Sequence, residues 1–208
     1  MPSPDSFQPE PDRPSRTELR KVLRKRRRAL TSQQQRQAAE QLARQLSGHP
    51  GLYRARHIAI YLPNDGEIDP GYYMEQARSR GVQFYLPVLH PIHKGRLVFR
   101  PYSRNTPLHP NRFGIPEPAL IERQTRPAWA LDAVLMPLVG FDRHGGRLGM
   151  GGGFYDRTFA FVRRLPALAP QLIGLAHEIQ RMNRLPVAPW DIPLDSIVTD
   201  RARFKATP

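Results

Sequence analysis

An apolar run that leads directly into a glycine-rich segment is the feature that most constrains the fold of this chain. Residues 132–139 are the most apolar stretch, and seven of the fourteen residues from Gly140 to Gly153 are glycine. Glycines at this density after a strand let backbone N–H groups surround an anion without side-chain collisions. Arg147 and Arg157 can add positive charge, and Asp156 is placed to hold a magnesium ion through an oxygen ligand. The segment therefore indicates a buried strand, a phosphate-binding turn and a following helix.

Other interpretations of the glycine-rich segment remain open from composition alone. The glycines also fit a flexible surface loop or a tightly packed turn. No Gly-Lys-Ser/Thr follows them, so the segment is not a Walker A loop, and Gly149-Met-Gly-Gly-Gly153 lacks the full spacing of the dinucleotide fingerprint. NAD binding is therefore not supported.

Strands and helices are expected to alternate along the chain after two N-terminal amphipathic helices at about 16–29 and 32–47. The apolar runs predict strands at 57–62, 82–88, 97–102, 132–139, 172–176 and 196–199, with helices near 71–80 and 151–164. This alternation predicts an α/β fold with a largely parallel sheet, in a single domain over 15–208. The proline-rich residues 1–14 are expected to form a disordered tail.

Composition excludes some classes of protein and leaves one rival. The chain has no cysteine, so disulfides and thiolate chemistry are impossible. The apolar stretches fall short of the roughly 18 residues of a membrane helix, and the polar N-terminus is not a signal peptide, so we expect a cytoplasmic protein. Of the net charge of +14, a net +8 lies between Arg13 and Arg28. This segment could bind nucleic acid or a membrane surface, but it could equally bind the phosphates and carboxylates of small substrates.

Two further segments are candidate ligand contacts. The acidic turn Pro63–Asp69 follows a predicted strand, which is where open α/β sheets place ligand contacts, and Glu67 could hydrogen-bond a nitrogen heterocycle. A solvated Asn-Asp-Gly turn is the simpler interpretation of these residues on their own. Phe113 could stack on a flat ring or could pack in a small satellite core. The seven histidines lack metal-ligand spacing and are each expected to be structural or exposed.

Taken in order, these segments resemble the 5-formyltetrahydrofolate cyclo-ligase family, and its bacterial members in particular. The resemblance covers about residues 15–200, and the glycine-rich block is highly specific for the family. The matching segments are Arg16-Thr-Glu-Leu-Arg20, Tyr61-Leu-Pro-Asn-Asp-Gly-Glu-Ile-Asp69, Phe113-Gly-Ile-Pro-Glu-Pro118, Phe141–Arg157 and Pro186-Val-Ala-Pro-Trp-Asp-Ile-Pro-Leu-Asp195.

The resemblance implies a three-layer α/β/α, Rossmann-like fold preceded by a basic helix. It also implies the reaction of ATP with 5-formyltetrahydrofolate to give ADP, phosphate and 5,10-methenyltetrahydrofolate, with Mg²⁺. We expect an iminium phosphate intermediate, formed when the formyl oxygen is phosphorylated. No nucleic-acid partner is expected, and a monomer is the default.

The resemblance also implies functional residues. The family's ATP-binding positions fall on Arg16, Thr17, Glu18, Leu19, Arg20, Arg147, Leu148, Gly149, Met150, Gly151, Gly152, Gly153, Phe154 and Tyr155. Its folate-binding positions fall on Leu62, Glu67, Phe113, Met150, Gly151, Gly152, Gly153 and Phe154, and its magnesium ligands on Asp156 and Asp195. We assign the central roles in the reaction to Arg147, Asp156 and Glu67.

Two departures from the family pattern affect these expectations. Arg16 stands where lysine is common, and a guanidinium and an ammonium are not equivalent phosphate partners. Phe154 stands where tyrosine is common, so any role of that hydroxyl is absent. Another ATP-dependent ligase or kinase on the same scaffold would share the nucleotide residues and differ around Glu67 and Phe113. A silent relative is the remaining alternative, and the presence of Glu67, Arg147, Asp156 and Asp195 argues against it.

Overall fold

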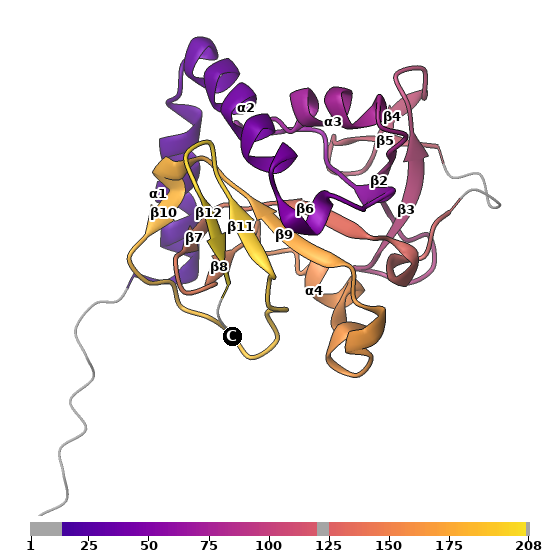
Figure 1. The fold of residues 1–208 in the computed structure, drawn as a ribbon. Coiled ribbons are helices and arrows are strands. Elements are labelled where there is room, and N and C mark those ends of the chain that lie inside the picture. Colours follow the sequence, from indigo (N-terminus) through magenta and orange to yellow (C-terminus); the bar gives the residue numbers. More distant parts are fainter. Residues whose placement is uncertain (1–13, 120–124, 207–208) are drawn as a thin grey trace, which may run out of the picture.

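A seven-stranded mixed sheet forms the centre of the molecule in the computed structural model, which describes residues 14–119 and 125–206 (Figure 1). The strand order is β12-β11-β9-β6-β1-β2-β3. The five inner strands are parallel, and the edge strands β3 and β12 are antiparallel to their neighbours. The strands are β1 (His57–Ala59), β2 (Gln83–Leu89), β3 (Leu97–Tyr102), β6 (Ala133–Pro137), β9 (Gln171–Leu175), β11 (Ser196–Val198) and β12 (Arg203–Lys205).

Both faces of the sheet are covered, but by different kinds of structure. The helices are α1 (Arg16–Arg28), α2 (Ser32–Ser47), α3 (Gly71–Arg78) and α4 (Phe154–Thr158). Because successive strand side chains point to opposite faces, Ile58 and Leu135 pack with α2 and α3, whereas Val134 packs with Phe159 on the other side. The first face therefore has the expected helix layer. The second is covered by α4, 3₁₀ turns and loops.

The glycine-rich segment forms a hairpin before it reaches a helix, which corrects the expected strand–turn–helix order. β7 (Gly140–Asp142) pairs with β8 (Arg147–Leu148), and β10 (Arg181–Met182) lies beside β7. The buried Asp142 carboxylate closes the turn by accepting the N–H groups of His144 (2.8 Å) and Gly146 (2.9 Å). The helix expected within 151–164 is the five-residue α4, which is followed by the 3₁₀ turn Ala160–Arg163.

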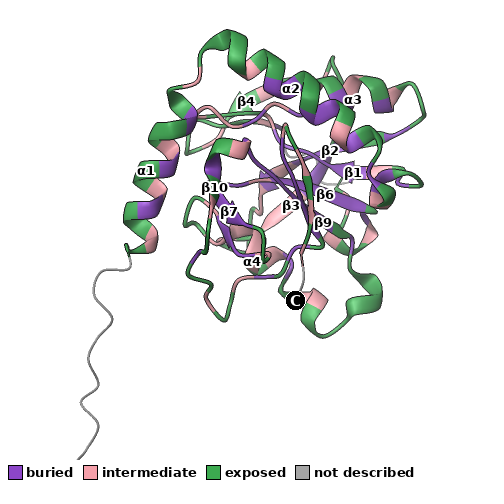
Figure 2. Cartoon of the chain, turned by 60° about the vertical axis from the view of Figure 1, so that its left-hand side comes forward, coloured by how far each residue is buried: buried purple, intermediate pink, exposed green. Residues whose placement is uncertain are grey.

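Helix α1 begins at a capping box and lies beside this small sheet. Ser15 and Glu18 satisfy each other's backbone N–H groups at its start. Leu19, Leu23 and Arg27 recur every four residues and form its buried side, while the rest of the helix is exposed or partly exposed (Figure 2). The two leucines pack in a small core with residues of β8 and of the segments next to β7 and β10, namely Val139, Leu148 and Leu185.

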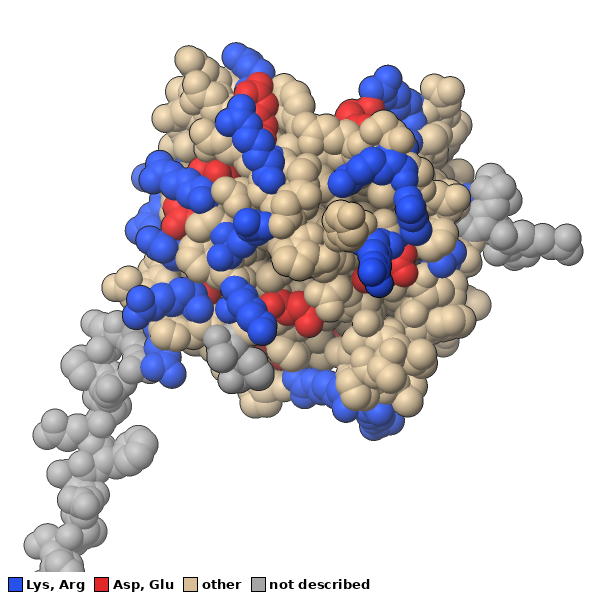
Figure 3. All heavy atoms as spheres, viewed as in Figure 1, with Lys and Arg blue, Asp and Glu red and all other residues tan. Residues whose placement is uncertain are grey.

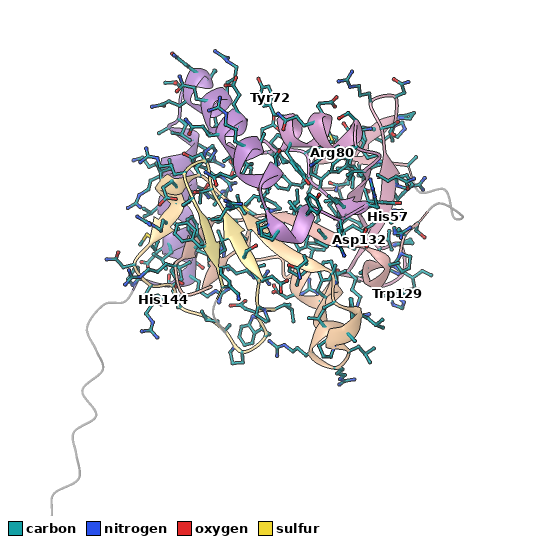
Figure 4. All side chains as sticks on the ribbon, viewed as in Figure 1. His57, Tyr72, Arg80, Trp129, Asp132 and His144 are labelled. Atoms are coloured by element: carbon teal, nitrogen blue, oxygen red, sulfur yellow. The ribbon has the colours of Figure 1, made fainter. Side chains whose placement is uncertain are left out.

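The amino ends of the parallel strands are fastened by a structural carboxylate. Figure 4 labels His57 and Asp132 close together at the starts of β1 and β6, away from His144 in the β7–β8 turn. Asp132 Oδ2 accepts the N–H groups of Arg56 and His57, both at 2.8 Å. Among the described residues, no helix has the length and apolarity needed to cross a membrane. Most of the tail predicted at residues 1–14 lies outside the described residues.

Candidate active site

The acidic turn after β1 is fastened to α1 at the carboxyl end of the sheet. Asp65 has a left-handed backbone conformation (φ 55°), which is uncommon for a residue other than glycine. Its carboxylate pairs with Arg24 and Arg27, each at 2.7 Å, and with Arg28. Burial alone would raise the pKa of Asp65, but the hydrogen bonds from these three arginines lower it to about 2. Asp65 is therefore ionised at neutral pH.

Glu67, two residues further on, is largely shielded from solvent. Its side chain is only 11% exposed, and its Oε2 atom accepts the N–H of Asn64 at 3.2 Å. Burial raises the pKa of Glu67 to about 7, against the opposing effect of Arg27, whose Nη2 atom lies 3.7 Å from Oε1. The interpretation as a solvated turn is thus wrong for this residue. A buried carboxyl group that titrates near neutrality is typical of a functional site.

The glycine-rich loop approaches the same place from the β7–β8 hairpin. Arg20 of α1 donates from Nε to the carbonyl oxygen of Gly149 at 2.8 Å. Met150 is half exposed, and its sulfur lies 3.9 Å from Nη2 of Arg27. Gly151 and Gly153 have positive φ angles of 94° and 61°, which only glycine adopts readily. Helix α1 thus contacts both the acidic turn and the glycine-rich loop.

Arg147 and Asp156 form a partly buried ion pair at the two ends of this loop. Nη2 of Arg147 donates to Oδ1 of Asp156, and the arginine side chain is only 8% exposed. Oδ1 of Asp156 also accepts the N–H of Ile192 at 3.1 Å. Nη1 of Arg147 lies 3.2 Å from the sulfur of Met136, near the end of β6. The two residues assigned central roles from the sequence are therefore in direct contact.

Asp191 is a neighbour of this ion pair that the sequence interpretation missed. It forms two hydrogen bonds with Arg16, at 2.6 and 3.1 Å. Burial would raise the pKa of Asp191, but the hydrogen bonds from Arg16 and Ala188 N–H, together with the charges of Arg16 and Arg147, lower it. Asp191 and Arg147 line one open cavity of about 1160 Å³. The one signal in the sequence was its place in the C-terminal motif.

Asp195, the residue expected beside Asp156 as a second magnesium ligand, is engaged elsewhere. Its Oδ2 atom accepts the N–H of Leu172 at 2.7 Å, near the amino end of β9. It lines the same cavity as Asp191, next to Ser196. The contacts of Asp156 run instead to Arg147 and Ile192, which is adjacent to Asp191. Asp156 is thus bonded to the residue that follows Asp191, whereas the hydrogen bond of Asp195 lies at the amino end of β9.

Aromatic rings border the site on the side of the β4–β5 hairpin, formed by Leu108–Pro110 and Pro116–Pro118. Phe113, in the hairpin turn, is 54% exposed and meets Phe154 edge to face, with 5.9 Å between ring centroids. Tyr155 stacks on Phe159 at 6.4 Å. Burial raises the pKa of the Tyr155 phenol, and the Glu67 carboxylate raises it further. Phe113 is therefore an exposed ring beside the site and not part of a satellite core.

The N-terminal motif divides between site and scaffold. Arg16 and Arg20 reach Asp191 and the glycine-rich loop, as described above. Glu18 serves the capping box and Leu19 is buried in the small core, so both have structural roles, while Thr17 is exposed. Leu62 packs against the main core, and Leu148 is buried in the small core. The structure thus brings together most, but not all, of the residues expected from the sequence.

Sequence comparisons identify relatives along nearly the whole chain. The model of the 5-formyltetrahydrofolate cyclo-ligase family matches residues 12–200. A 5-formyltetrahydrofolate cyclo-ligase of Escherichia coli strain K12 is 43% identical over 178 residues, which cover 86% of this chain and 96% of the relative. A protein of the same name from Haemophilus influenzae is 39% identical over 183 residues, with 88% and 96% covered.

Solved structures agree with these relatives. The NMR structure of Aquifex aeolicus 5,10-methenyltetrahydrofolate synthetase matches with a TM-score of 0.75 and 28% identity, covering 91% of this chain and 92% of that chain. A synthetase of the same name from Mycoplasma pneumoniae shares the fold, with a TM-score of 0.69 at 23% identity and coverage of 89% and 99%. The match of the family model over residues 12–200 and the 43% identity to the Escherichia coli relative show that the chain belongs to the 5-formyltetrahydrofolate cyclo-ligase family.

Proposed function

We propose that this 5-formyltetrahydrofolate cyclo-ligase activates its substrate by transferring the γ-phosphoryl group of ATP to the formyl oxygen. The formyl oxygen attacks phosphorus, and ADP leaves with the bridging oxygen. N10 of the folate then attacks the carbon of the resulting iminium phosphate and closes a five-membered ring. The bond between carbon and the former formyl oxygen breaks, phosphate leaves with that oxygen, and the N10 proton is released. The product is the 5,10-methenyl cation.

The proposed reaction requires no covalent nucleophile from the protein. A formamide is a poor electrophile because its nitrogen donates into the carbonyl, and oxide is a very poor leaving group. Phosphorylation corrects both faults, so the protein needs no covalent nucleophile. A chain without cysteine is compatible with such a reaction. Catalysis then depends on positioning the two substrates and on stabilising charge, as in other phosphoryl transfers.

The folate is proposed to bind between the acidic turn and the aromatic side of the glycine-rich loop. Glu67, buried at the carboxyl end of β1, is suited to accept hydrogen bonds from N–H groups of the pterin ring. The exposed ring of Phe113, with Phe154 edge-on to it, offers a surface for a flat ring. Leu62 and the backbone of residues 150–153 complete the proposed folate contacts.

The ATP phosphates are proposed to bind near the two ends of the glycine-rich loop. Arg16 and Arg20 approach from α1, and Arg147 approaches from β8. Each guanidinium can turn planar N–H pairs towards phosphate oxygens. The amide groups of residues 149–153 add donors without a charge, since glycines there leave the backbone accessible. This arrangement would place the γ-phosphoryl group close to the proposed folate pocket.

Asp156 and Asp191 are the residues proposed to hold Mg²⁺, and their chemistry fits that ion. Among the described residues, no group of three or more Asp, Glu, His or Cys side chains could enclose a metal by itself. Mg²⁺ commonly binds through one or two carboxylates, with substrate phosphates and water as its other ligands. When bound, the ion would neutralise negative charge on the transferring phosphoryl group. Asp156 and Asp191 also orient Arg147 and Arg16.

The observation that carries the proposal is the junction of Glu67, the glycine-rich loop and the Arg147–Asp156 pair at one end of the sheet. The test is a reaction with substrate labelled by ¹⁸O in the formyl group, with mass analysis of the released phosphate. We expect one labelled oxygen in each phosphate formed. Label released as water, with unlabelled phosphate, would contradict phosphorylation of the formyl oxygen.

Several broader properties expected from the sequence are proposals at the same level. These are a monomeric state, a cytoplasmic location and no nucleic-acid partner. We also propose that the fold is a three-layer sandwich, in which α4 and the 3₁₀ turns form the third layer.

A further inference from the structure

Arg27 is a charged residue at a position where the helix pattern calls for an apolar one. It continues the buried side of α1 after Leu19 and Leu23, and its side chain is fully buried. A charged side chain is almost never buried to this extent without partners, because its desolvation costs several kcal/mol. The contacts of Arg27 therefore indicate what the residue does.

These contacts join three segments of the site. Nε donates to the carbonyl oxygen of Asp65 at 2.8 Å, and Nη2 donates to the Asp65 carboxylate at 2.7 Å. Nη2 also lies 3.7 Å from Oε1 of Glu67 and 3.9 Å from the sulfur of Met150. On its other side, Nη1 lies 3.4 Å from the carbonyl oxygen of Leu138, just after β6. One guanidinium thus spans the acidic turn, the glycine-rich loop and the end of a central strand.

The other two arginines on the acidic turn do not reach as far. Arg24 and Arg28 both pair with Asp65, and their side chains are 34% and 54% exposed. Arg24 and Arg28 each form an ion pair with Asp65 at a distance below 4 Å. Arg27 lies within 4 Å of the carboxylates of both Asp65 and Glu67. Arg24 and Arg28 therefore attach α1 to the acidic turn, whereas Arg27 also acts on Glu67.

We infer that Arg27 is a positioning residue for the folate subsite, which orients the Glu67 carboxylate and favours its charged form while Asp65 fixes the guanidinium. The inference rests on the proposed contact between Glu67 and the folate. A guanidinium suits this role because its planar fork can serve two carboxylates and a carbonyl group at once. Lysine carries the same charge but lacks the fork. Arg27 touches neither substrate in this account, so it is not itself a catalytic residue.

Other titratable groups near Glu67 also affect its titration, and a test of Arg27 must take them into account. Arg24 lowers the pKa of Glu67 and Asp65 raises it, both from the region where α1 meets the turn. The phenols of Tyr155, from α4, and Tyr61, after β1, face the same carboxylate. Replacing Arg27 leaves all four in place. A change in the titration of Glu67 can therefore be ascribed to Arg27 if the fold is kept.

The test compares steady-state kinetics of Arg27→Gln, Arg27→Lys, Arg28→Gln and Glu67→Gln with those of the wild-type protein between pH 6 and 9. Arg28→Gln is the matched control, because Arg28 lies on the same helix, carries the same charge and also pairs with Asp65. We expect Arg27→Gln to raise KM for 5-formyltetrahydrofolate by about tenfold or more, since it leaves a buried carboxylate unpaired. KM for ATP should change by less than about twofold, and Arg28→Gln should change either KM by less than about twofold.

The pH profile and the lysine variant separate positioning from simple packing. Loss of the nearby cation raises the pKa of Glu67, so the acid limb of kcat/KM for the folate should move to higher pH in Arg27→Gln. Arg27→Lys should restore the limb while KM stays raised by about threefold, because charge returns without the fork. A folate KM for Arg27→Gln that matches that of Arg28→Gln would overturn the inference.

Two further results keep the inference open to test. If Arg27→Gln does not fold, as judged by circular dichroism and a thermal melt, Arg27→Lys carries the test alone, and an unchanged folate KM in that variant overturns the inference. If Glu67→Gln leaves the folate KM unchanged, the proposed role of Glu67 fails and the inference fails with it. A raised folate KM in Glu67→Gln with an unchanged one in Arg27→Gln rejects only the role of Arg27.

Discussion

Burial gives Glu67 a pKa of about 7, compared with an ordinary value of 4.5. The folded protein therefore holds the proton of this group more tightly than the unfolded chain does. The stabilising contribution of this proton is fully present below about pH 4.5 and is lost as the pH rises through about 7. The same carboxylate is proposed to bind folate in its ionised form. Glu67 thus opposes stability under the conditions in which it is needed.

Replacing Glu67 with glutamine should consequently make the protein more stable in mild alkali. The two pKa values differ by about 2.5, and one unit of pKa corresponds to about 1.36 kcal/mol, which sets an upper limit of roughly 3.4 kcal/mol. We expect the wild-type protein to lose stability relative to Glu67→Gln between pH 5 and pH 8. Urea denaturation of both proteins at the two pH values measures this difference. Parallel changes in the two proteins would mean that Glu67 titrates at its ordinary pKa.

Asp156, Asp191 and Asp195 can be distinguished by the same substitution to asparagine. Asp156→Asn removes the charge next to Arg147 and one proposed metal ligand, so we expect kcat to fall by ~100-fold with the fold retained. Asp191→Asn should raise the concentration of Mg²⁺ required for half-maximal activity, and Asp195→Asn should not. Titration of activity with Mg²⁺ provides the measurement. If Asp195→Asn alone raises the requirement, Asp195 is the second ligand and our choice of Asp191 is wrong.

The sequence was sufficient to single out Glu67, Arg147 and Asp156 as candidate site residues, because each lies in a distinctive motif. It could not distinguish Asp191 from Asp195, since both belong to one motif and the difference depends on contacts with Arg16 and Leu172. Nor could it give the pKa of Glu67, which depends on how deeply the turn is buried under α1. Contacts between segments distant in sequence decide both points.

Among the elements, α1 links the scaffold to the site. The expected bounds of 16–29 and 32–47 for the first two helices differ from α1 and α2 by one residue at most. Strong apolar spacing and the caps Ser15 and Thr31 explain this agreement. The β7–β8 hairpin was missed because strands of two or three residues have no measurable periodicity.

The packing of α1 can be tested through Leu23, which is fully buried in the small core. Leu23→Ala should lower the free energy of unfolding by about 2–5 kcal/mol, because it removes buried methyl groups and leaves a cavity. The neighbouring Val22 is 48% exposed, so Val22→Ala serves as the control and should cost less than about 0.5 kcal/mol. Denaturant unfolding measures both. Equal effects of the two variants would contradict the proposed docking of α1.

At the scale of the whole molecule, a mostly parallel sheet collects the ends of several chain segments at one edge. Such edges are the usual ligand sites of α/β proteins. The positive charge is not gathered into one continuous patch on the face in Figure 3, where lysine and arginine side chains form separate groups with acidic residues among them. Part of the basic excess is used internally, because Arg16, Arg24 and Arg27 pair with carboxylates of the site. The rival prediction of a nucleic-acid protein, based on composition alone, did not take these pairs into account.

The most direct test of the account follows formation of the methenyl product by its near-ultraviolet absorbance, using purified protein, 5-formyltetrahydrofolate and Mg-ATP. We predict a signal that requires the protein, ATP and magnesium together and that disappears when any one of them is omitted. Absence of product from folded protein that still binds ATP would contradict the account. Product formation without ATP would contradict it equally, because the formyl oxygen would then leave without being phosphorylated.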